Sequence, residues 1–382
     1  MRRRQLLSLS LAAAGVALLP GLAFAQAQEK RLILVLLNGA LDGLALCAPT
    51  MDPDYRRRRG HLALDGPEHP QGVLELDGFF GLHPAMAPIH PWFATGELGL
   101  VHAIALPYTG RSHFDALDLL ENGTERPQGS RTGWLNRALL ASGGSALAVG
   151  DQLPLVLRGE APVDSVDLSR EMHSDAAFLS AMQTLYQRDA LLGPAYTQGL
   201  ALRMELAEDG QTMARTTRKD LGLNPGLARQ LGRLMAPADG PQVAVVQMGG
   251  WDTHNNQQRR LDANLGRLAD GLAALKKGLG PRWEDTLVLA VTEFGRTVRG
   301  NGTAGSDHGT GSAALYAGGA AAGGVVLGDW PGLAQLHEDR DLRPTTDLRA
   351  LFKAALEHLG APTDERVFPG AAGLRSLGSV LA

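Results

Sequence analysis

The segment from Pro241 to His308 constrains the fold most strongly, because two short apolar runs flank a long helical pattern. The runs Val243–Gln247 and Thr286–Val291 are rich in β-branched residues, and a helix is predicted between them over Asn256–Lys277. Continuous apolar runs that alternate with helices are typical of parallel strands buried on both faces. The segment therefore predicts an α/β protein with a mostly parallel central sheet flanked by helices, a three-layer α/β/α arrangement.

The rest of the chain extends this pattern. Residues 26–382 are predicted to form a single domain, with a helical insertion around residues 160–238, where no metal-ligand spacing occurs. Further strands are predicted over Arg31–Leu37 and Leu98–Ala103, an edge strand over Ala313–Ala317, and helices over Pro84–Ala94 and Thr346–Leu359.

The first 25 residues resemble an export signal. Arg2, Arg3 and Arg4 precede the apolar stretch Leu6–Leu22, and small residues at 23–25 favour cleavage after Ala25. The Arg-Arg pair followed by Gln-Leu-Leu resembles the twin-arginine signal, which predicts a periplasmic or secreted protein that contacts the twin-arginine export machinery. An uncleaved membrane anchor is the alternative, although Gly15 and Pro20 break the apolar stretch.

Cleavage after Ala25 would leave 357 residues with no permanent membrane span expected. It would also remove three arginines, taking the formal net charge from −4 to −7. An acidic chain is not typical of nucleic-acid binding, so we expect no nucleic-acid partner. Cys47 is the only cysteine, which excludes an intramolecular disulfide.

Acidic and imidazole side chains follow the predicted strands. Because the carboxyl ends of parallel strands meet at one edge of a sheet, such residues can reach one cleft. Carboxylates and imidazoles together suit a divalent metal ion such as zinc, manganese or calcium. The candidate metal ligands are Asp42, Asp252, His254, Glu293, Asp307 and His308.

Each candidate also has a simpler interpretation. Asp252 and His254 lie on one side of an extended backbone and could share a structural hydrogen bond. Asp307 and His308 could form a solvated pair in a glycine-rich loop. Glu293 could pair with Arg296 instead of binding a metal or acting as a general base.

Ser112 and Thr109 are candidate nucleophiles that precede a predicted helix. A hydroxyl at a helix N-terminus benefits from unpaired N–H groups, which also attract a phosphate-like group. Ser112 could equally be only an N-cap, with Asp115 three residues later. His113 could act as an acid, bind the transferred group or simply pack. Arg111 and Arg296 are candidates for stabilising charge on that group.

Six motifs in this order resemble the domain of unknown function 1501 family: the twin-arginine signal, LNGALDGL, RSHFDALDLLENG, GGWDTHNNQ, TEFGRT and SDHGTG. That family is similar to a branch of the alkaline phosphatase and sulfatase superfamily. The resemblance implies an alkaline phosphatase-like three-layer fold with a one- or two-metal site for ester hydrolysis.

The resemblance also implies roles for individual residues. Asp42 resembles the metal aspartate of the first strand, and Ser112, or else Thr109, falls where a nucleophile or formylglycine precursor begins a helix. Asp252 and His254 resemble a ligand pair. Glu293 corresponds to an aspartate ligand, and His308, with Asp307, resembles the last ligand histidine.

The sequence departs from the superfamily pattern in three ways. One residue separates Asp252 from His254 where phosphatases typically have three, and Phe294 stands where a second-site histidine is expected. The Cys-x-Pro-x-Arg signature of sulfatases is absent from the sequence. Two hypotheses therefore remain: an exported metal-dependent hydrolase of phosphate or, less favoured, sulfate esters on small molecules or polymers, and a non-catalytic cell-envelope binding protein with the same fold.

Overall fold

The structure of the chain is a computed structural model that describes residues 30–150, 152–166, 176–186, 193, 197 and 222–382. The predicted signal peptide, residues 1–25, lies outside the described residues, as does much of the predicted insertion at 160–238. Within the described part of the chain, no helix combines the length and apolar character needed to cross a bilayer.

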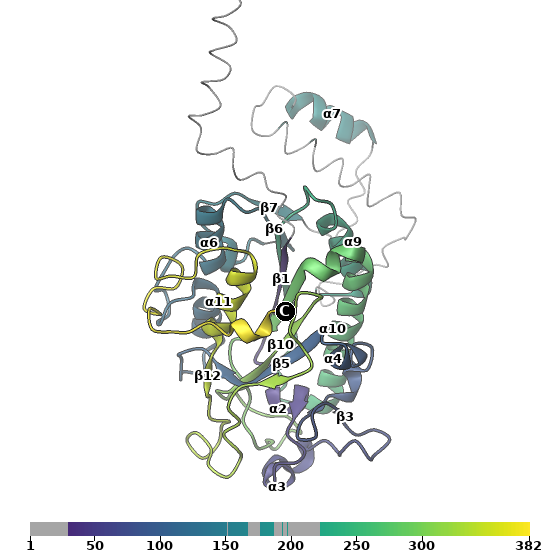
Figure 1. Cartoon of the computed structure of the whole chain (residues 1–382), viewed down its shortest axis with the longest axis vertical. Coiled ribbons are helices and arrows are strands. Elements are labelled where there is room, and N and C mark those ends of the chain that lie inside the picture. The colour runs from purple at the N-terminus through teal and green to yellow at the C-terminus, as the bar shows by residue number, and fades with distance from the viewer. Residues whose placement is uncertain (1–29, 151, 167–175, 187–192, 194–196, 198–221) are drawn as a thin grey trace, which may run out of the picture.

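A single large sheet forms the centre of the molecule (Figure 1). Most of its strand pairs are parallel, and β10 alone among its described strands runs antiparallel to both neighbours. In spatial order the strands are β11 (Val326–Leu327), β5 (Leu98–Ala105), β10 (Ser312–Ala317), β9 (Thr286–Val291), β1 (Arg31–Asn38), β8 (Val243–Gly249), β6 (Ala146–Val149) and β7 (Val163–Val166), with β12 (Thr346–Asp347) also paired to β5. A small second sheet contains β2 (Cys47–Ala48), β4 (Gly81–Leu82) and β3 (Leu74–Glu75).

Helices cover both faces of the large sheet, with α6 and α11 on one side and α9 and α10 on the other in Figure 1. Strand alternation explains the two layers, because successive side chains of β1 point to opposite faces. Ile33, Val35 and Leu37 pack with the α9 and α10 layer, whereas Leu32, Leu34 and Leu36 pack with the α6 and α11 layer.

The helices have the following bounds within the described residues. They are α2 (Gly43–Leu46), α3 (Tyr55–Arg59), α4 (Pro91–Ala94), α5 (His113–Asn122), α6 (Trp134–Ser142), α7 (Ala176–Tyr186), α9 (Pro225–Met235), α10 (Gln257–Leu279) and α11 (Leu348–His358). The predicted fold class is confirmed: a mostly parallel sheet lies between two layers of helices.

Two predicted elements were wrong in detail. The helix predicted over Pro84–Ala94 is two short pieces, a 3₁₀ turn over Pro84–Met86 and α4, because Pro88 and Pro91 lack the N–H that a continuous helix needs. The edge strand predicted over Ala313–Ala317 is the interior strand β10, between β5 and β9, and it is buried throughout. A continuous apolar run without polar alternation fits that interior position.

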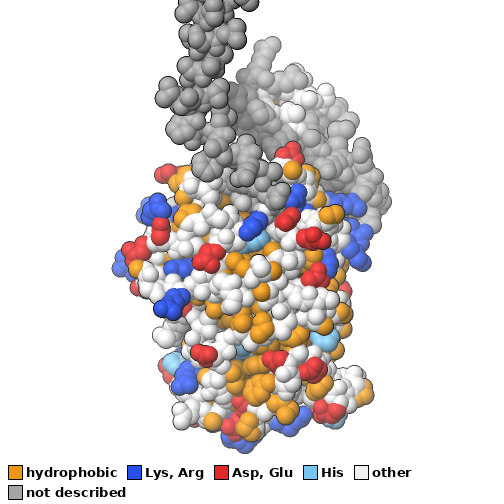
Figure 2. Space-filling view, in the orientation of Figure 1, with side chains coloured by type: hydrophobic (Ala, Val, Ile, Leu, Met, Phe, Trp, Pro, Cys, Tyr) orange, Lys and Arg blue, Asp and Glu red, His pale blue; other side chains and the backbone are white. Residues whose placement is uncertain are grey.

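The surface shown in Figure 2 carries acidic and basic side chains intermixed, with hydrophobic side chains between them. Charges of one sign do not gather over this face into a single large patch.

The buried His102 of β5 makes the stability of the core depend on pH. Its side chain is 1% exposed, its Nε2 donates to the Cys47 carbonyl oxygen at 2.8 Å, and burial lowers the pKa of the imidazole to about 4. The unfolded chain, with an ordinary histidine pKa of about 6.5, therefore takes up the proton first as the pH falls. Stability from the neutral ring is complete above about pH 6.5 and declines towards pH 4.

We predict that the unsubstituted chain loses about 2 kcal/mol more unfolding free energy between about pH 7 and pH 5 than the His102→Gln variant does. Glutamine keeps a donor for the Cys47 carbonyl but has no ring to protonate. Urea unfolding at the two pH values measures this difference. His69→Gln on the surface is the control and should leave the pH dependence unchanged. An identical pH dependence in the His102→Gln variant would contradict the prediction.

Candidate metal centre

The register of the central strands brings three loops together. In β1, Asn38 pairs with Gly249 of β8, and Leu36 pairs with Val291 of β9, so the three strands end at the same rim. Gly39 follows β1 with a φ of +125°, and a Cβ there would lie 2.6 Å from the Asp252 amide nitrogen. Only glycine fits this approach, which holds the loop after β1 against the loop after β8.

A second backbone contact places His308. Residues 295–297, after β9, pair antiparallel with residues 307–309, before β10: the Thr297 amide donates to the Asp307 carbonyl and the Gly309 amide to the Gly295 carbonyl. A Cβ at Gly309 would lie 2.4 Å from the Arg296 carbonyl carbon. The glycine-rich loop can therefore fold back and return His308 to the rim.

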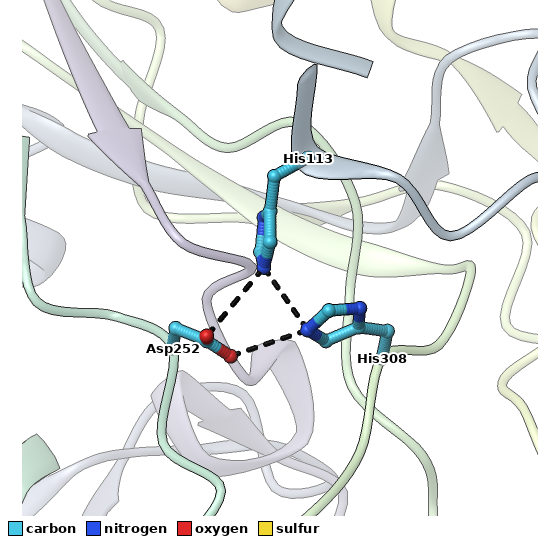
Figure 3. A group of neighbouring side chains, drawn as sticks. All are labelled: His113, Asp252 and His308. Atoms are coloured by element: carbon cyan, nitrogen blue, oxygen red, sulfur yellow. Dashed lines mark hydrogen bonds and ion pairs between the residues drawn. The ribbon is translucent and has the colours of Figure 1, made fainter. Parts of the chain in front are cut away.

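His113, Asp252 and His308 converge at this rim (Figure 3). They come from the first turn of α5, the loop after β8 and the loop before β10. The His113 and His308 Nε2 atoms lie 3.0 Å apart, His308 Nε2 lies 3.3 Å from Asp252 Oδ1, and His113 Nε2 lies 3.7 Å from Asp252 Oδ2. We call these three residues the metal triad.

His254 adjoins the metal triad. Its Nε2 atom lies 3.0 Å from His308 Nε2 and 3.0 Å from Asp252 Oδ1. A fourth potential donor therefore borders the same small space.

The Nδ1 atom of each histidine faces an acceptor. His113 Nδ1 lies 2.7 Å from Glu293 Oε1, His254 Nδ1 lies 3.2 Å from Asp307 Oδ1, and His308 Nδ1 lies 2.9 Å from the Arg111 carbonyl oxygen. Because these oxygens accept hydrogen bonds, we assign the ring proton of each neutral histidine to Nδ1. Metal-binding histidines commonly show this arrangement, which fixes the tautomer and the ring orientation.

The consequence is that Nε2 lone pairs face one another. Two unprotonated ring nitrogens 3.0 Å apart repel unless a proton or a cation lies between them. Around an ion with bonds of about 2.0–2.1 Å, tetrahedral ligand atoms lie about 3.3–3.4 Å apart. The 3.0–3.7 Å separations of the metal triad fit this spacing. The donor set therefore fits a single divalent cation.

The surroundings of Asp252 and His308 shift the pKa values of both side chains. Partial burial acts to raise the pKa of Asp252, but the Arg296 hydrogen bond and charge bring it below its ordinary value. Burial lowers the pKa of His308. The hydrogen bond to Glu293 raises the pKa of His113 above its ordinary value. Asp252 is thus held ionised and His308 neutral, whereas a cation would compete with a proton at His113.

The site is open on one side. The Asp252 side chain is 44% exposed and the two histidines of the metal triad are about a quarter exposed, whereas Glu293 behind them is fully buried. Solvent or a small molecule can therefore reach the ligands from the outside.

Asp42 lies apart from these converging groups. Its Oδ2 accepts from Arg59 Nη2 at 2.6 Å and from Gln257 Nε2 at 2.5 Å, and its Oδ1 accepts from the Leu44 amide at the start of α2. The Arg59 guanidinium supplies the positive charge that this buried carboxylate requires. The structure thus places Asp42 in an ion pair, not beside the metal triad.

Glu293 and Asp307 are also candidate ligands. In the structure they contact the Nδ1 atoms of His113 and His254, on the side of each ring away from the metal triad. Glu293 Oε1 accepts from the Gly39 and Ala40 amides at 2.8 and 3.1 Å as well as contacting His113. Asp307 contacts Asn301 and His254. Both carboxylates therefore orient histidines in the structure.

The candidate arginines are engaged by carboxylates. Arg111 binds Glu338 and Asp341, and Arg296 Nη1 donates to Asp252 Oδ1 at 2.6 Å. Ser112 is the N-cap of α5, and its Oγ accepts from the Asp115 amide at 3.4 Å. The hydroxyl of Ser112 thus serves the helix in this structure.

The sequence left the roles of acid, binder of the transferred group and packing side chain open for His113, and the structure places it inside the metal triad. His113 directly follows the Ser112 cap, at the start of the helix that comes after β5. The sequence therefore carried a signal that this residue lies at the rim. Phe294, which occupies the position where a second-site histidine is expected, is buried and stacks on the His113 ring with centroids 4.9 Å apart. Thr109 lies in the loop before α5.

Residues 29–378 match the family described as protein of unknown function (DUF1501), so the chain belongs to that family. The resemblance inferred from the six motifs is confirmed at this level. No curated protein matches the chain significantly.

Solved structures similar to this chain include an alkaline phosphatase superfamily protein from Vibrio parahaemolyticus (12% identity, 92% of this chain and 71% of that chain, TM-score 0.41). Others are the zinc complex of the C-terminal periplasmic domain of EcEptC from Escherichia coli (9%, 76% and 73%, 0.36) and a cold-active alkaline phosphatase from Shewanella sp. (14%, 69% and 68%, 0.34). Because these TM-scores lie below 0.5, we base the assignment of the site on its own geometry.

We predict that Glu293→Gln weakens Zn²⁺ binding by about 10- to 100-fold, because the uncharged amide makes His113 a poorer ligand. Competition titration against a chelating dye measures the dissociation constant. Glu365→Gln, at an exposed position, is the matched control. Equal Zn²⁺ affinity of the Glu293→Gln variant and the unsubstituted protein would show that Glu293 does not support the ligand.

Proposed function

We propose that this protein is an exported metal-dependent hydrolase that acts on phosphate esters and, less favourably, on sulfate esters. The observation that carries this proposal is the convergence of two histidine Nε2 atoms and the Asp252 carboxylate at a solvent-accessible rim. A site with three protein ligands and an open side is typical of catalytic rather than structural metal centres.

The ligand chemistry favours zinc or manganese over calcium. Calcium prefers oxygen ligands, whereas imidazole suits zinc and other transition metals. His113, Asp252 and His308 would hold the ion, and His254 borders the same space. When bound, such an ion acts as a Lewis acid and makes a coordinated water a stronger nucleophile.

The chain's own groups supply orientation. Glu293 fixes the His113 ring, Asp307 fixes the His254 ring, and Arg296 fixes Asp252. His113 lies in the first turn of α5, a ten-residue helix, so the positive end of the helix dipole faces the same space. The dipole and the cation together attract an anionic ester on a small molecule or a polymer.

Export by the twin-arginine pathway into the periplasm or beyond belongs to the same proposal. Its support is the pattern at residues 2–25, with the arginine pair, the apolar stretch and the small residues before Gln26. An export machinery that carries folded proteins would allow the metal to be bound before translocation.

A second candidate function is non-catalytic binding in the cell envelope. It is favoured by the two candidate arginines, which are occupied by carboxylates, and by Ser112, which caps a helix. A fold retained without its catalytic groups would bind a ligand without turnover.

We predict that the Zn²⁺- or Mn²⁺-loaded protein hydrolyses at least one member of a panel of phosphate mono- and diesters and sulfate esters. The double variant Asp252→Ala, His308→Ala should lose at least about 1,000-fold in kcat/KM, because it removes two ligands. His69→Ala is the control. Binding of panel members without any turnover would favour the envelope-binding function.

We predict that Ser112→Ala retains hydrolysis within about threefold while destabilising the protein by about 1 kcal/mol, the usual effect of losing an N-cap. Steady-state kinetics and thermal unfolding measure the two effects. A loss of activity as large as that of the double variant would instead identify Ser112 as the nucleophile.

A further inference from the structure

A chain of buried hydrogen bonds joins Asp42 to the metal triad. We propose that Asp42, Gln257, Ser306 and Arg296 form a positioning relay that fixes the Asp252 carboxylate for the cation. The inference rests on the metal centre of the proposed function and assigns these residues no contact with substrate. Each member is at most 1% exposed, so solvent does not compete for its hydrogen bonds.

The relay begins at the Asp42 carboxylate, which accepts hydrogen bonds. Asp42 Oδ2 lies 2.6 Å from Nη2 of the buried Arg59, and because a guanidinium can only donate, this carboxylate oxygen accepts. Gln257, the first residue of α10, donates its Nε2–H to Asp42 Oδ2 at 2.5 Å. This bond decides which end of the Gln257 amide faces Asp42, and it leaves Oε1 pointing the other way.

The orientation of Gln257 then sets the orientation of Ser306. Gln257 Oε1 can only accept, and it accepts from the Ser306 hydroxyl and from Thr253 Oγ1 at 3.0 Å. Since the Ser306 hydroxyl hydrogen is used in this bond, its oxygen presents a lone pair to Arg296. Arg296 Nε donates to Ser306 Oγ at 3.1 Å, and Nη2 donates to the Ser306 carbonyl oxygen.

Two bonds to Ser306 hold the planar guanidinium of Arg296 in one orientation. From that orientation Nη1 donates to Asp252 Oδ1 at 2.6 Å. Asp252 is the most exposed member of the metal triad, so its orientation depends on polar contacts more than on packing. The buried relay therefore adds rigidity to the most exposed ligand of the metal triad.

The relay also ties separate parts of the chain to one ligand. Asp42 follows β1, Gln257 begins α10, and Arg296 and Ser306 lie at opposite ends of the loop between β9 and β10. Asp42 consequently acts on the metal site through three intervening side chains. The relay gives this buried ion pair a role in ligand geometry in addition to any role in stability.

The test compares two hydroxyls that donate to the same oxygen. Ser306→Ala removes the hydroxyl that accepts from Arg296 Nε and donates to Gln257, and it keeps the backbone carbonyl that accepts from Nη2. The matched control Thr253→Val removes only the parallel bond to Gln257. Both side chains are fully buried. We expect Ser306→Ala to weaken Zn²⁺ binding by about 10- to 100-fold, as for other groups behind metal ligands, and Thr253→Val to change it by less than about threefold.

Zn²⁺ affinity is measured by competition titration of the full chain, with thermal unfolding recorded in parallel. If Ser306→Ala does not fold, Arg296→Lys keeps the charge without the planar fork and should give a comparable loss of affinity. Equal changes in Ser306→Ala and Thr253→Val, or no change in either, would overturn the relay. Failure of the proposed hydrolysis would appear separately, as a protein that binds Zn²⁺ with normal affinity but turns over no ester.

Discussion

The parallel pairing of β8, β1 and β9 is the constraint on which the site depends. In-register pairing ends the three strands at one level, so the loops that follow them share one rim. Asp252 lies directly at that rim. Glu293 lies behind it and accepts hydrogen bonds from the backbone amides of Gly39 and Ala40. A shift of register would separate the carboxylates from the histidines they orient, because each strand would end at a different height.

Ion pairs decide which acidic side chains lie at the candidate metal centre. Asp42, which the superfamily resemblance makes a metal ligand, is neutralised by the buried Arg59 guanidinium. Arg296 neutralises part of the charge on Asp252, and the buried Phe294 ring packs on His113. The ionic partner of each carboxylate thus decides whether it lies at the metal triad or apart from it.

The sequence predicts the architecture well, since the central strands are long apolar runs whose burial follows from composition. Thr286–Val291 has the predicted bounds, and β1 and β8 extend at most two residues beyond them. The break in the helix predicted over Pro84–Ala94 and the interior position of β10 were missed, because an apolar pattern shows neither where prolines end a helix nor which strands flank a buried run. The candidate site is only partly predictable from sequence, because strand ends show which residues share a rim but not which atoms converge.

The positions of His113 and Glu293 illustrate this limit. Both side chains lie at the rim, but their 2.7 Å contact and the hydrogen bonds that Glu293 accepts from backbone amides leave His113 in the metal triad and Glu293 behind it. Similarly, whether Asp42 binds a metal depends on Arg59, seventeen positions away in the chain. Contacts of this kind depend on the packing of loops, which local sequence patterns do not determine.

The proposed function requires one divalent cation between His113, Asp252 and His308. Elemental analysis of protein purified from its native compartment tests it most directly. We predict about one equivalent of zinc or manganese per chain, released at low pH as the ligand side chains take up protons. A protein that carries no metal and does not take one up from excess Zn²⁺ or Mn²⁺ would contradict the account.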